Sequence, residues 1–332
     1  MKHTATRPIR PLLRTTLAAA SVAVTALAVT AGTASAAPVA TTAATTTTTA
    51  RHQLARTVTG ELVPVTPTNH HTPVHPEAVT HPNADSMGST VAAHEKQAST
   101  TSGADAATEA AAEASAVRPA SSVPQLPGID VSDNQGDVDW ASVAPNIDFA
   151  YAKATEGTYY TNGDFANQYN GPYDAGVIRG AYHFAIPNNS GGAAQADYFI
   201  DNGGGWSGDG KTLPGALDIE YNPYGAECYG LSQSSMVDWV WDFVDEYASR
   251  EGVYPVIYTT TDWWTTCTGD YSGFASYDPL WVANYSASGG GTLPDGWGYY
   301  TFWQYADSGS EPGDQDVFNG AYSQLQALAD NG

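Results

Sequence analysis

The chain has 332 residues, with 12 lysines and arginines against 35 aspartates and glutamates, and a formal net charge of −23. Residues before Gly128 carry 8 basic and 7 acidic side chains and no Phe, Trp or Tyr, whereas the rest carries 4 basic and 28 acidic side chains. The first part therefore lacks the residues of an ordinary core, and the acidic remainder excludes a nucleic-acid binder or adhesion to anionic lipid.

The first 36 residues have the pattern of a secretory signal peptide. A positively charged start with Lys2 and three arginines precedes an apolar stretch over about 17–29, and Ala34-Ser35-Ala36 follows as a cleavage site. The apolar stretch is shorter than the ~20 residues that span a bilayer. We predict a signal peptide over 1–36, cleavage after about Ala36, secretion and no membrane insertion.

Residues 37–125 are dominated by Ala, Thr, Pro, Ser and Val, and include the run Thr45–Thr49. Such a composition buries too little apolar surface to offset the entropy of ordering the backbone. We predict a disordered linker or pro-region, either removed on maturation or used for surface attachment, and a separate domain over 126–332.

Short apolar segments with the residues that favour strands recur through this domain. The predicted strands are Gly128–Ser132, Phe149–Thr155, Ile178–Ala185, Gly215–Glu220, Tyr254–Thr260, Leu280–Tyr285, Tyr300–Ala306 and, more briefly, Asp316–Phe318.

Helices are predicted between several of these strands. The clearest covers Ser234–Arg250, where apolar residues recur on one face between a serine cap and Gly252. Others cover Gly192–Asp201 and Gln324–Ala329, and a helix from Phe165 is expected to break or kink at Gly171-Pro172. The alternation predicts an α/β fold, as a (β/α) barrel or as an open doubly wound sheet. No G-x-G-x-x-G follows the first strand, so dinucleotide binding has no support.

The segment Gly215–Glu220 places two acids, Asp218 and Glu220, on the same side of an apolar strand. Two neighbouring acids repel, and partial burial can keep one protonated while the other carries charge. Glycoside hydrolysis needs such a pair, although two solvated acids at a strand end remain the alternative. Asp130 ends the first strand in the same way, and Asp314 and Asp316 lie near the last.

Aromatic residues accompany these acids at strand ends. Tyr and Trp offer a flat apolar face and one polar group, which suits sugar rings, although about half of them are expected to be core. The positions are Tyr151, Tyr182, Tyr221, Tyr258, Trp281, Tyr285, Trp303 and Tyr305.

Cys228 and Cys267 are the two cysteines. In an exported protein a disulfide is favoured. The alternative, a cysteine nucleophile, would need a histidine, and His183 is the domain's only one.

Five segments in order give the domain a specific resemblance to glycoside hydrolase family 25, the Chalaropsis-type lysozymes or N-acetylmuramidases. They are Gly128–Ser132, Phe149–Gly157, Arg179–Phe184, Leu217–Glu220 and Phe302–Tyr305. The resemblance implies an irregular, TIM-like (β/α) barrel of about eight strands. It also implies hydrolysis of the β-1,4 bond between N-acetylmuramic acid and N-acetylglucosamine in peptidoglycan.

The resemblance also implies roles for individual residues. Glu220 is expected to be the general acid/base and Asp218 the second carboxylate, with Asp130 and Asp314 as further catalytic acids. The residues expected to bind substrate are Tyr151, Glu156, Tyr182, Tyr258, Trp281 and Gln304. No cofactor or metal is expected; the expected partner is the peptidoglycan glycan strand, and we expect a monomer.

Several alternatives remain open from the sequence. A chitin-active glycosidase also places acids one residue apart at a strand end, and a non-catalytic cell-wall sugar-binding module would need the aromatics without the acids. The sequence does not decide between retention and inversion of the anomeric carbon.

Overall fold

The computed structural model describes residues 54–65, 85–101, 123–286 and 289–332, all within the compact unit Ala50–Gly332. The predicted signal peptide and its cleavage point lie outside the described residues. Of the helices in the described ranges, none is long and apolar enough to span a membrane.

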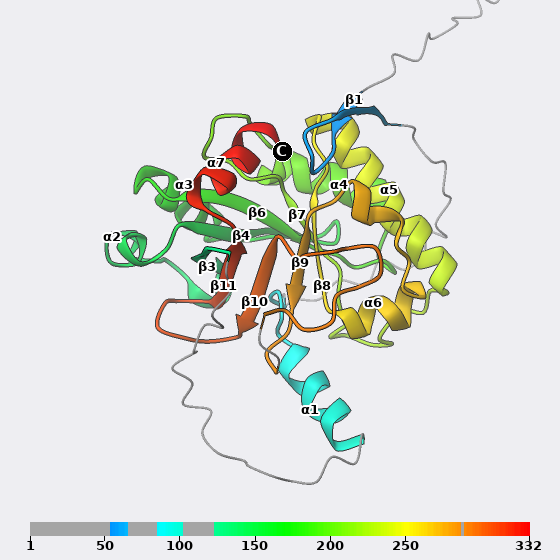
Figure 1. The fold of residues 1–332 in the computed structure, drawn as a ribbon. Helices are drawn as coiled ribbons and strands as arrows, with labels where there is room; N and C mark the ends of the chain where they lie inside the picture. Colours follow the sequence, from blue (N-terminus) through cyan, green and yellow to red (C-terminus); the bar gives the residue numbers. More distant parts are fainter. Residues whose placement is uncertain (1–53, 66–84, 102–122, 287–288) are drawn as a thin grey trace, which may run out of the picture. The chain divides into compact units, whose positions relative to one another are not determined.

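A closed barrel forms the centre of this unit (Figure 1). In chain order its strands are β3 (Gln125–Val131), β4 (Phe149–Glu156), β6 (Ile178–Phe184), β7 (Ala216–Asp218), β8 (Val256–Thr259), β9 (Leu280–Ala283), β10 (Phe302–Ala306) and β11 (Asp314–Asn319). The sheet runs β3-β11-β10-β9-β8-β7-β6-β4, and pairing of β3 with β4 closes it; β5 (Tyr160–Thr161) adds to the edge of β4.

The barrel is irregular because β11 runs antiparallel to both of its neighbours, β10 and β3, whereas the other barrel strands pair in parallel. The first residues of β11 therefore lie at the same end as the last residues of the other strands. The α/β barrel prediction is confirmed, and the open doubly wound sheet is excluded.

Helices connect and cover the strands. They are α2 (Trp140–Val143), α3 (Phe165–Asp174), α4 (Gly192–Phe199), α5 (Gln233–Glu251), α6 (Thr261–Thr268) and α7 (Tyr322–Asn331). The longest, α5, begins and ends as the sequence predicts: the Ser232 hydroxyl accepts the Ser235 amide at 3.2 Å, and Gly252 ends the helix at φ 76°.

The expected break at Gly171-Pro172 does not occur, because α3 continues through Pro172 to Asp174. Pro172 lacks the amide for one helical hydrogen bond, but only two residues of the helix follow it, so little of the helix depends on that bond. Gly171 is packed closely against the Trp140 ring, which holds α3 against α2.

Two parts of residues 37–125 are ordered, contrary to the expectation of disorder for that region. A hairpin of β1 (Leu54–Arg56) and β2 (Leu62–Pro64) precedes the helix α1 (Val91–Thr101). Figure 1 places α1 at the end of the barrel toward which β9 and β10 point, and β1 near the opposite end, beside α5. A few buried apolar residues order these segments, and average composition does not reveal them.

Candidate active site

Acidic side chains gather at the carboxyl end of the barrel. Asp130 is the next-to-last residue of β3, Asp218 ends β7 and Glu220 follows two residues later, and all three are buried. Asp314 and Asp316 join them from the start of β11, where Asp314 is paired in register with Asp130. The reversed direction of β11 thus brings the acids from both ends of the domain sequence together.

Asp218 and Glu220 form the centre of this group. Their carboxyl groups interact with each other, which agrees with the shared side that strand alternation predicts. Among the described residues, no donor reaches either oxygen of Asp218 or the Oε2 atom of Glu220. Two buried carboxylates in contact without donors would repel strongly, so the pair retains a proton between them.

The surroundings raise the affinity of this pair for protons. Burial raises the pKa of Glu220 to about 8, although the Gly88 amide opposes the shift by donating to its Oε1 atom at 2.7 Å. Burial, together with the neighbouring Glu220 charge, raises the pKa of Asp218 well above its ordinary value. At neutral pH the pair therefore supplies an acid that solvated carboxyl groups would not supply.

Gln304 on β10 organises the neighbouring acids. Its Nε2 atom donates to Asp130 at 2.7 Å and to Asp314 at 2.9 Å, while its Oε1 atom accepts the hydroxyls of Tyr258 and Tyr285, each at 2.7 Å. All hydrogen-bonding positions of the amide are used, which fixes its orientation.

Burial also raises the pKa of the acids that Gln304 holds. It raises the pKa of Asp130 to about 7, against the opposing hydrogen bond from Gln304. It raises the pKa of Asp314 to about 10, and the nearby Asp130 charge adds to the shift.

A second polar group surrounds Glu156 at the end of β4. The Oε2 atom of this buried carboxylate pairs with the buried Lys153 ammonium at 2.7 Å, and its Oε1 atom accepts the hydroxyls of Tyr159 at 2.7 Å and Tyr224 at 2.8 Å. These partners compensate the burial of its charge and hold it in one orientation.

Two of the predicted sugar-binding tyrosines lie beside the acids. Tyr258 reaches them through Gln304, and Tyr182 interacts with the charges of Asp130 and Asp218. Tyr285, which ends the predicted strand Leu280–Tyr285, also contacts Gln304 and belongs to this group. Tyr285, like Tyr258, lies at the end of a predicted strand, so its position in the sequence is the feature that indicates a place at the site.

The structure places Tyr151 and Trp281 in the barrel interior, and their role in substrate binding stays a prediction. Both are fully buried in the barrel interior, with ring centroids 4.8 Å apart. The Tyr151 hydroxyl donates to the Pro214 carbonyl before β7, at the far end of the strand from Asp218, at 2.9 Å. The Trp281 indole donates to Asp316 at 3.0 Å, so it contacts one of the neighbouring acids.

The cysteine prediction is confirmed. Cys228 and Cys267 form a disulfide with a Cα–Cα distance of 5.3 Å, so neither is a nucleophile. His183 is buried among Thr155 and Gln195, at 2.7 and 2.9 Å, and burial lowers its pKa to about 3. In the described ranges, no group of three or more His, Cys, Asp or Glu residues is arranged to hold a metal ion.

The carboxyl end of the barrel is covered by residues of the chain itself. Glu220 is only 1% exposed, and the Gly88 amide that contacts it comes from the segment before α1. A glycan could not approach Glu220 while this segment is in place.

Comparison with known proteins finds one family over this domain. The family described as Glycosyl hydrolases family 25 matches residues 129–314. Lysozyme M1 of Streptomyces globisporus is 52% identical over 210 residues, which are 61% of this chain and 71% of that protein. The N,O-diacetylmuramidase of Chalaropsis sp is 48% identical over 206 residues, 61% of this chain and 98% of that protein.

A similar fold occurs in a solved structure. The muramidase from Acremonium alcalophilum superposes with a TM-score of 0.61 at 58% identity, over 62% of this chain and 100% of that one. The matched part of this chain therefore corresponds to the whole chain of that structure.

Proposed function

Because the chain belongs to glycosyl hydrolases family 25, we propose that it is a lysozyme of the muramidase type. Its substrate is the β-1,4 bond between N-acetylmuramic acid and N-acetylglucosamine in bacterial peptidoglycan. The observation that carries this proposal is the buried, interacting pair of Asp218 and Glu220 at the end of β7, whose burial raises the pKa of both carboxyl groups. The names of the muramidase relatives support the choice of substrate.

Glu220 is the general acid in this proposal. Its raised pKa keeps it protonated near neutral pH, so it can donate to the glycosidic oxygen as the bond breaks. The proton leaves with the free hydroxyl of the departing sugar, and Glu220 then takes a proton from the water that completes hydrolysis.

Asp218 assists from the same side of the substrate. Two carboxyl groups that flank a sugar are separated by about 5 Å in retaining enzymes with a carboxylate nucleophile, and by roughly 6.5–9.5 Å in inverting ones. Asp218 and Glu220 instead lie two residues apart at the end of one strand and interact directly, so they do not face each other across a bound sugar. This favours attack by the substrate's own acetamido oxygen on the anomeric carbon, with Asp218 supporting the acetamido group, and hence retention.

The anomeric outcome can be measured directly. NMR of the first-formed product is expected to show the β-anomer before mutarotation. An initial α-anomer would exclude the assisted route and favour direct attack by water.

The remaining predicted residues shape the site. Asp130 and Asp314 are held by Gln304 at the site. Asp130, with a pKa raised to about 7, can carry negative charge that favours a positively charged transition state, and Tyr182 and Tyr258 offer hydroxyls to the sugar. Glu156, fixed by Lys153, is positioned to accept hydroxyl donors of a bound glycan.

Product analysis tests the proposed substrate bond. The chain is first cut by limited proteolysis within residues 102–122 and the amino-terminal fragment is separated from the domain, because that fragment covers Glu220; the domain so freed is the cut chain in the tests below. Purified peptidoglycan is then digested and the new reducing ends are converted to alcohols with borohydride. We expect muramitol; glucosaminitol would contradict the muramidase proposal.

Cleavage of soluble chitin oligomers alone would favour a chitinase, and binding without cleavage would favour a sugar-binding module.

The cellular setting is part of the proposal. The signal-peptide pattern over 1–36 supports secretion, and the domain limits 37–125 and 126–332 follow the change in composition. Amino-terminal sequencing of protein from the culture medium is expected to begin at or after Ala37. A start within residues 1–36 would contradict the cleavage site.

A further inference from the structure

Residues 85–90 form a turn directly over the acids and lead into α1. The Ser89 amide donates to the Ser86 carbonyl at 3.2 Å, and the Val91 amide donates to the Gly88 carbonyl at 3.0 Å, which closes the turn before the helix. The groove at the carboxyl end of the barrel is therefore filled by a compact structure of the same chain.

The backbone of Gly88 contacts the proposed catalytic residue. Its amide donates to Glu220 Oε1 at 2.7 Å, and its carbonyl accepts the Tyr285 hydroxyl at 3.3 Å. The backbone here has a φ of +75°, and a Cβ atom would collide with Tyr285 and Gln304. Only glycine fits this position, because it alone adopts a positive φ freely and has no Cβ atom that would collide.

The segment also binds at the Glu156 side of the groove. The Asp85 amide donates to Glu156 Oε2 at 3.1 Å, and the Asp85 carbonyl accepts the Lys153 ammonium. The Met87 amide lies 3.4 Å from the Tyr182 hydroxyl, which accepts it. The charged and hydroxyl groups proposed to hold a glycan are thus occupied by backbone groups.

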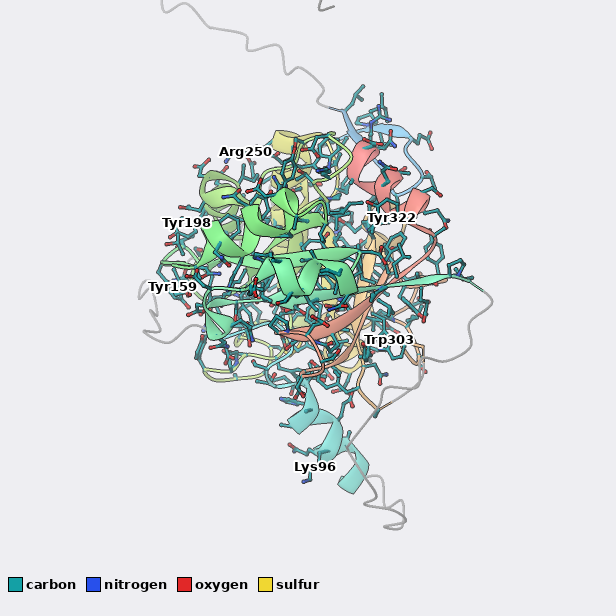
Figure 2. All side chains as sticks on the ribbon, turned by 90° about the vertical axis from the view of Figure 1, so that its left-hand side faces the viewer. Lys96, Tyr159, Tyr198, Arg250, Trp303 and Tyr322 are labelled. Atoms are coloured by element: carbon teal, nitrogen blue, oxygen red, sulfur yellow. A yellow bond between two sulfur atoms is a disulfide. The ribbon has the colours of Figure 1, made fainter. Side chains whose placement is uncertain are left out.

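On the other side, α1 contacts the loops after β7 and β9. The His94 ring stacks on Tyr221 with centroids 3.6 Å apart, and Glu95 accepts the Tyr285 amide at 2.8 Å. Figure 2 shows Lys96 on the part of α1 that extends away from the barrel.

Apolar packing strengthens these contacts. Met87 and Val91 are 0% and 1% exposed and belong to the same interior cluster as Tyr182 and Tyr258. Full burial of a methionine or valine side chain contributes favourably to docking, and a charge at either place would be strongly unfavourable.

The hairpin β1–β2 attaches the same region at the opposite end of the barrel. The Arg56 amide donates to the Gly252 carbonyl at 3.1 Å, and Ala55 is fully buried. Val253, next to Gly252, pairs with Arg56 and precedes β8, so the hairpin lies at the amino ends of the strands. The hairpin is thus a second attachment, in addition to the contacts at the groove. It limits how far residues 85–98 can move from the groove, which raises their effective concentration there.

We propose that residues 85–98 are an autoinhibitory segment that occupies the catalytic groove and excludes the glycan until the chain is cut or the segment is displaced. The identification of the groove as catalytic rests on the proposed function. The occupancy itself rests on the contacts of Gly88, Met87 and His94 described above.

The test compares two substitutions that add the same charge. Met87→Asp places a carboxylate in the buried cluster beside the acids, whereas Ala93→Asp places one on the exposed face of the first turn of α1. Both are made in the uncut chain from Ala37 on. Lysis of purified peptidoglycan and hydrogen exchange of residues 85–95, read by mass spectrometry, are measured on each.

We expect slow exchange and weak lysis in the parent and in Ala93→Asp. Met87→Asp is expected to exchange rapidly and to lyse walls roughly tenfold faster or more, because the open fraction sets the observed rate. Gly88→Ala provides a second variant of the same segment with the same expected direction, should Met87→Asp not fold.

Equal lysis by the parent and both segment variants, or free exchange of the Gly88 amide in the parent, would overturn the proposal. Absence of lysis from every form, with exchange slow in the parent and fast in Met87→Asp, would instead contradict the muramidase function and leave the occupancy of the groove supported.

Discussion

Glu220 differs from an ordinary surface glutamate in what surrounds its carboxyl group. Asp218 contacts it, no described donor reaches its Oε2 atom, and the covering Gly88 amide takes its Oε1 atom. Burial favours the neutral form and the amide favours the charged form, and burial has the larger effect. Burial thus keeps Glu220 protonated as an acid, and the covering segment keeps the substrate away from it.

The pH dependence of lysis follows from this environment. A general acid works in its protonated form, so activity is present below the pKa of Glu220 and lost as the pH rises through it. In the covered protein that pKa is raised to about 8. Removal of the covering segment reduces burial, which lowers the pKa, and removes the Gly88 hydrogen bond, which raises it, so the alkaline limb for the cut chain is expected near pH 8. A rate that stays constant to about pH 10 would contradict the assignment.

Gln304 stabilises the acid cluster as a neutral donor. Gln304→Glu keeps the shape but replaces the donor shared by Asp130 and Asp314 with a third carboxyl group. We expect a loss of about 3–5 kcal/mol in unfolding free energy at pH 8, and a smaller loss at pH 5, where the acids are protonated. Denaturant titration measures it.

The matched control is Gln326→Glu, which makes the same change on the exposed face of α7. A loss of stability in Gln304→Glu no larger than in this control would show that the shared amide does not stabilise the cluster.

At the scale of elements, β7 and the loop after it bring the site together. Only Ala216–Asp218 is strand, and Glu220 lies just beyond it. The following loop carries Tyr224 to Glu156 and is joined to α6 through Cys228 and Cys267. The disulfide therefore limits the motion of the loop that borders the groove.

Removal of this disulfide is expected to destabilise the domain. The double change Cys228→Ser and Cys267→Ser opens a loop with a sequence separation of 39 residues, which corresponds to about 4 kcal/mol on the chain-entropy estimate. Denaturant unfolding of the oxidised parent and the variant measures the difference. A change below about 1 kcal/mol would show that packing of the Trp263 and Trp264 region holds the loop without it.

For the whole molecule, the acidic charge of the domain bears on its action at the cell wall. From Gly128 on, 28 acidic side chains face only 4 basic ones. Walls that carry anionic polymers repel such a surface over a Debye length of about 30 Å at 0.01 M salt and about 10 Å at 0.1 M.

We therefore expect the cut chain to lyse whole walls faster at about 0.1 M salt than at about 0.01 M. Peptidoglycan stripped of its anionic polymers serves as the control and should respond less. A fall in lysis on adding moderate salt would contradict a repulsive effect of the domain charge.

The sequence predicted those features that depend on local order. Strand positions, the helix α5 and the shared side of Asp218 and Glu220 follow from periodicity within one segment. The alternation of side chains along a strand does not reveal that Tyr151 points its hydroxyl to the far end of the barrel. The contact of Gly88 with Glu220 joins residues 132 positions apart, and a composition averaged over residues 37–125 conceals the few side chains that make such docking possible.

The central claim is that Glu220 supplies the proton for glycosidic cleavage. The direct measurement is the rate at which the cut chain carrying Glu220→Gln releases new reducing ends from peptidoglycan. The control variant is Glu227→Gln, on the loop after β7, and thermal unfolding checks that each variant is folded. The account predicts a loss of roughly 10²- to 10⁴-fold for Glu220→Gln and little change for Glu227→Gln. A folded Glu220→Gln protein that releases reducing ends at a rate close to the parent's would contradict it.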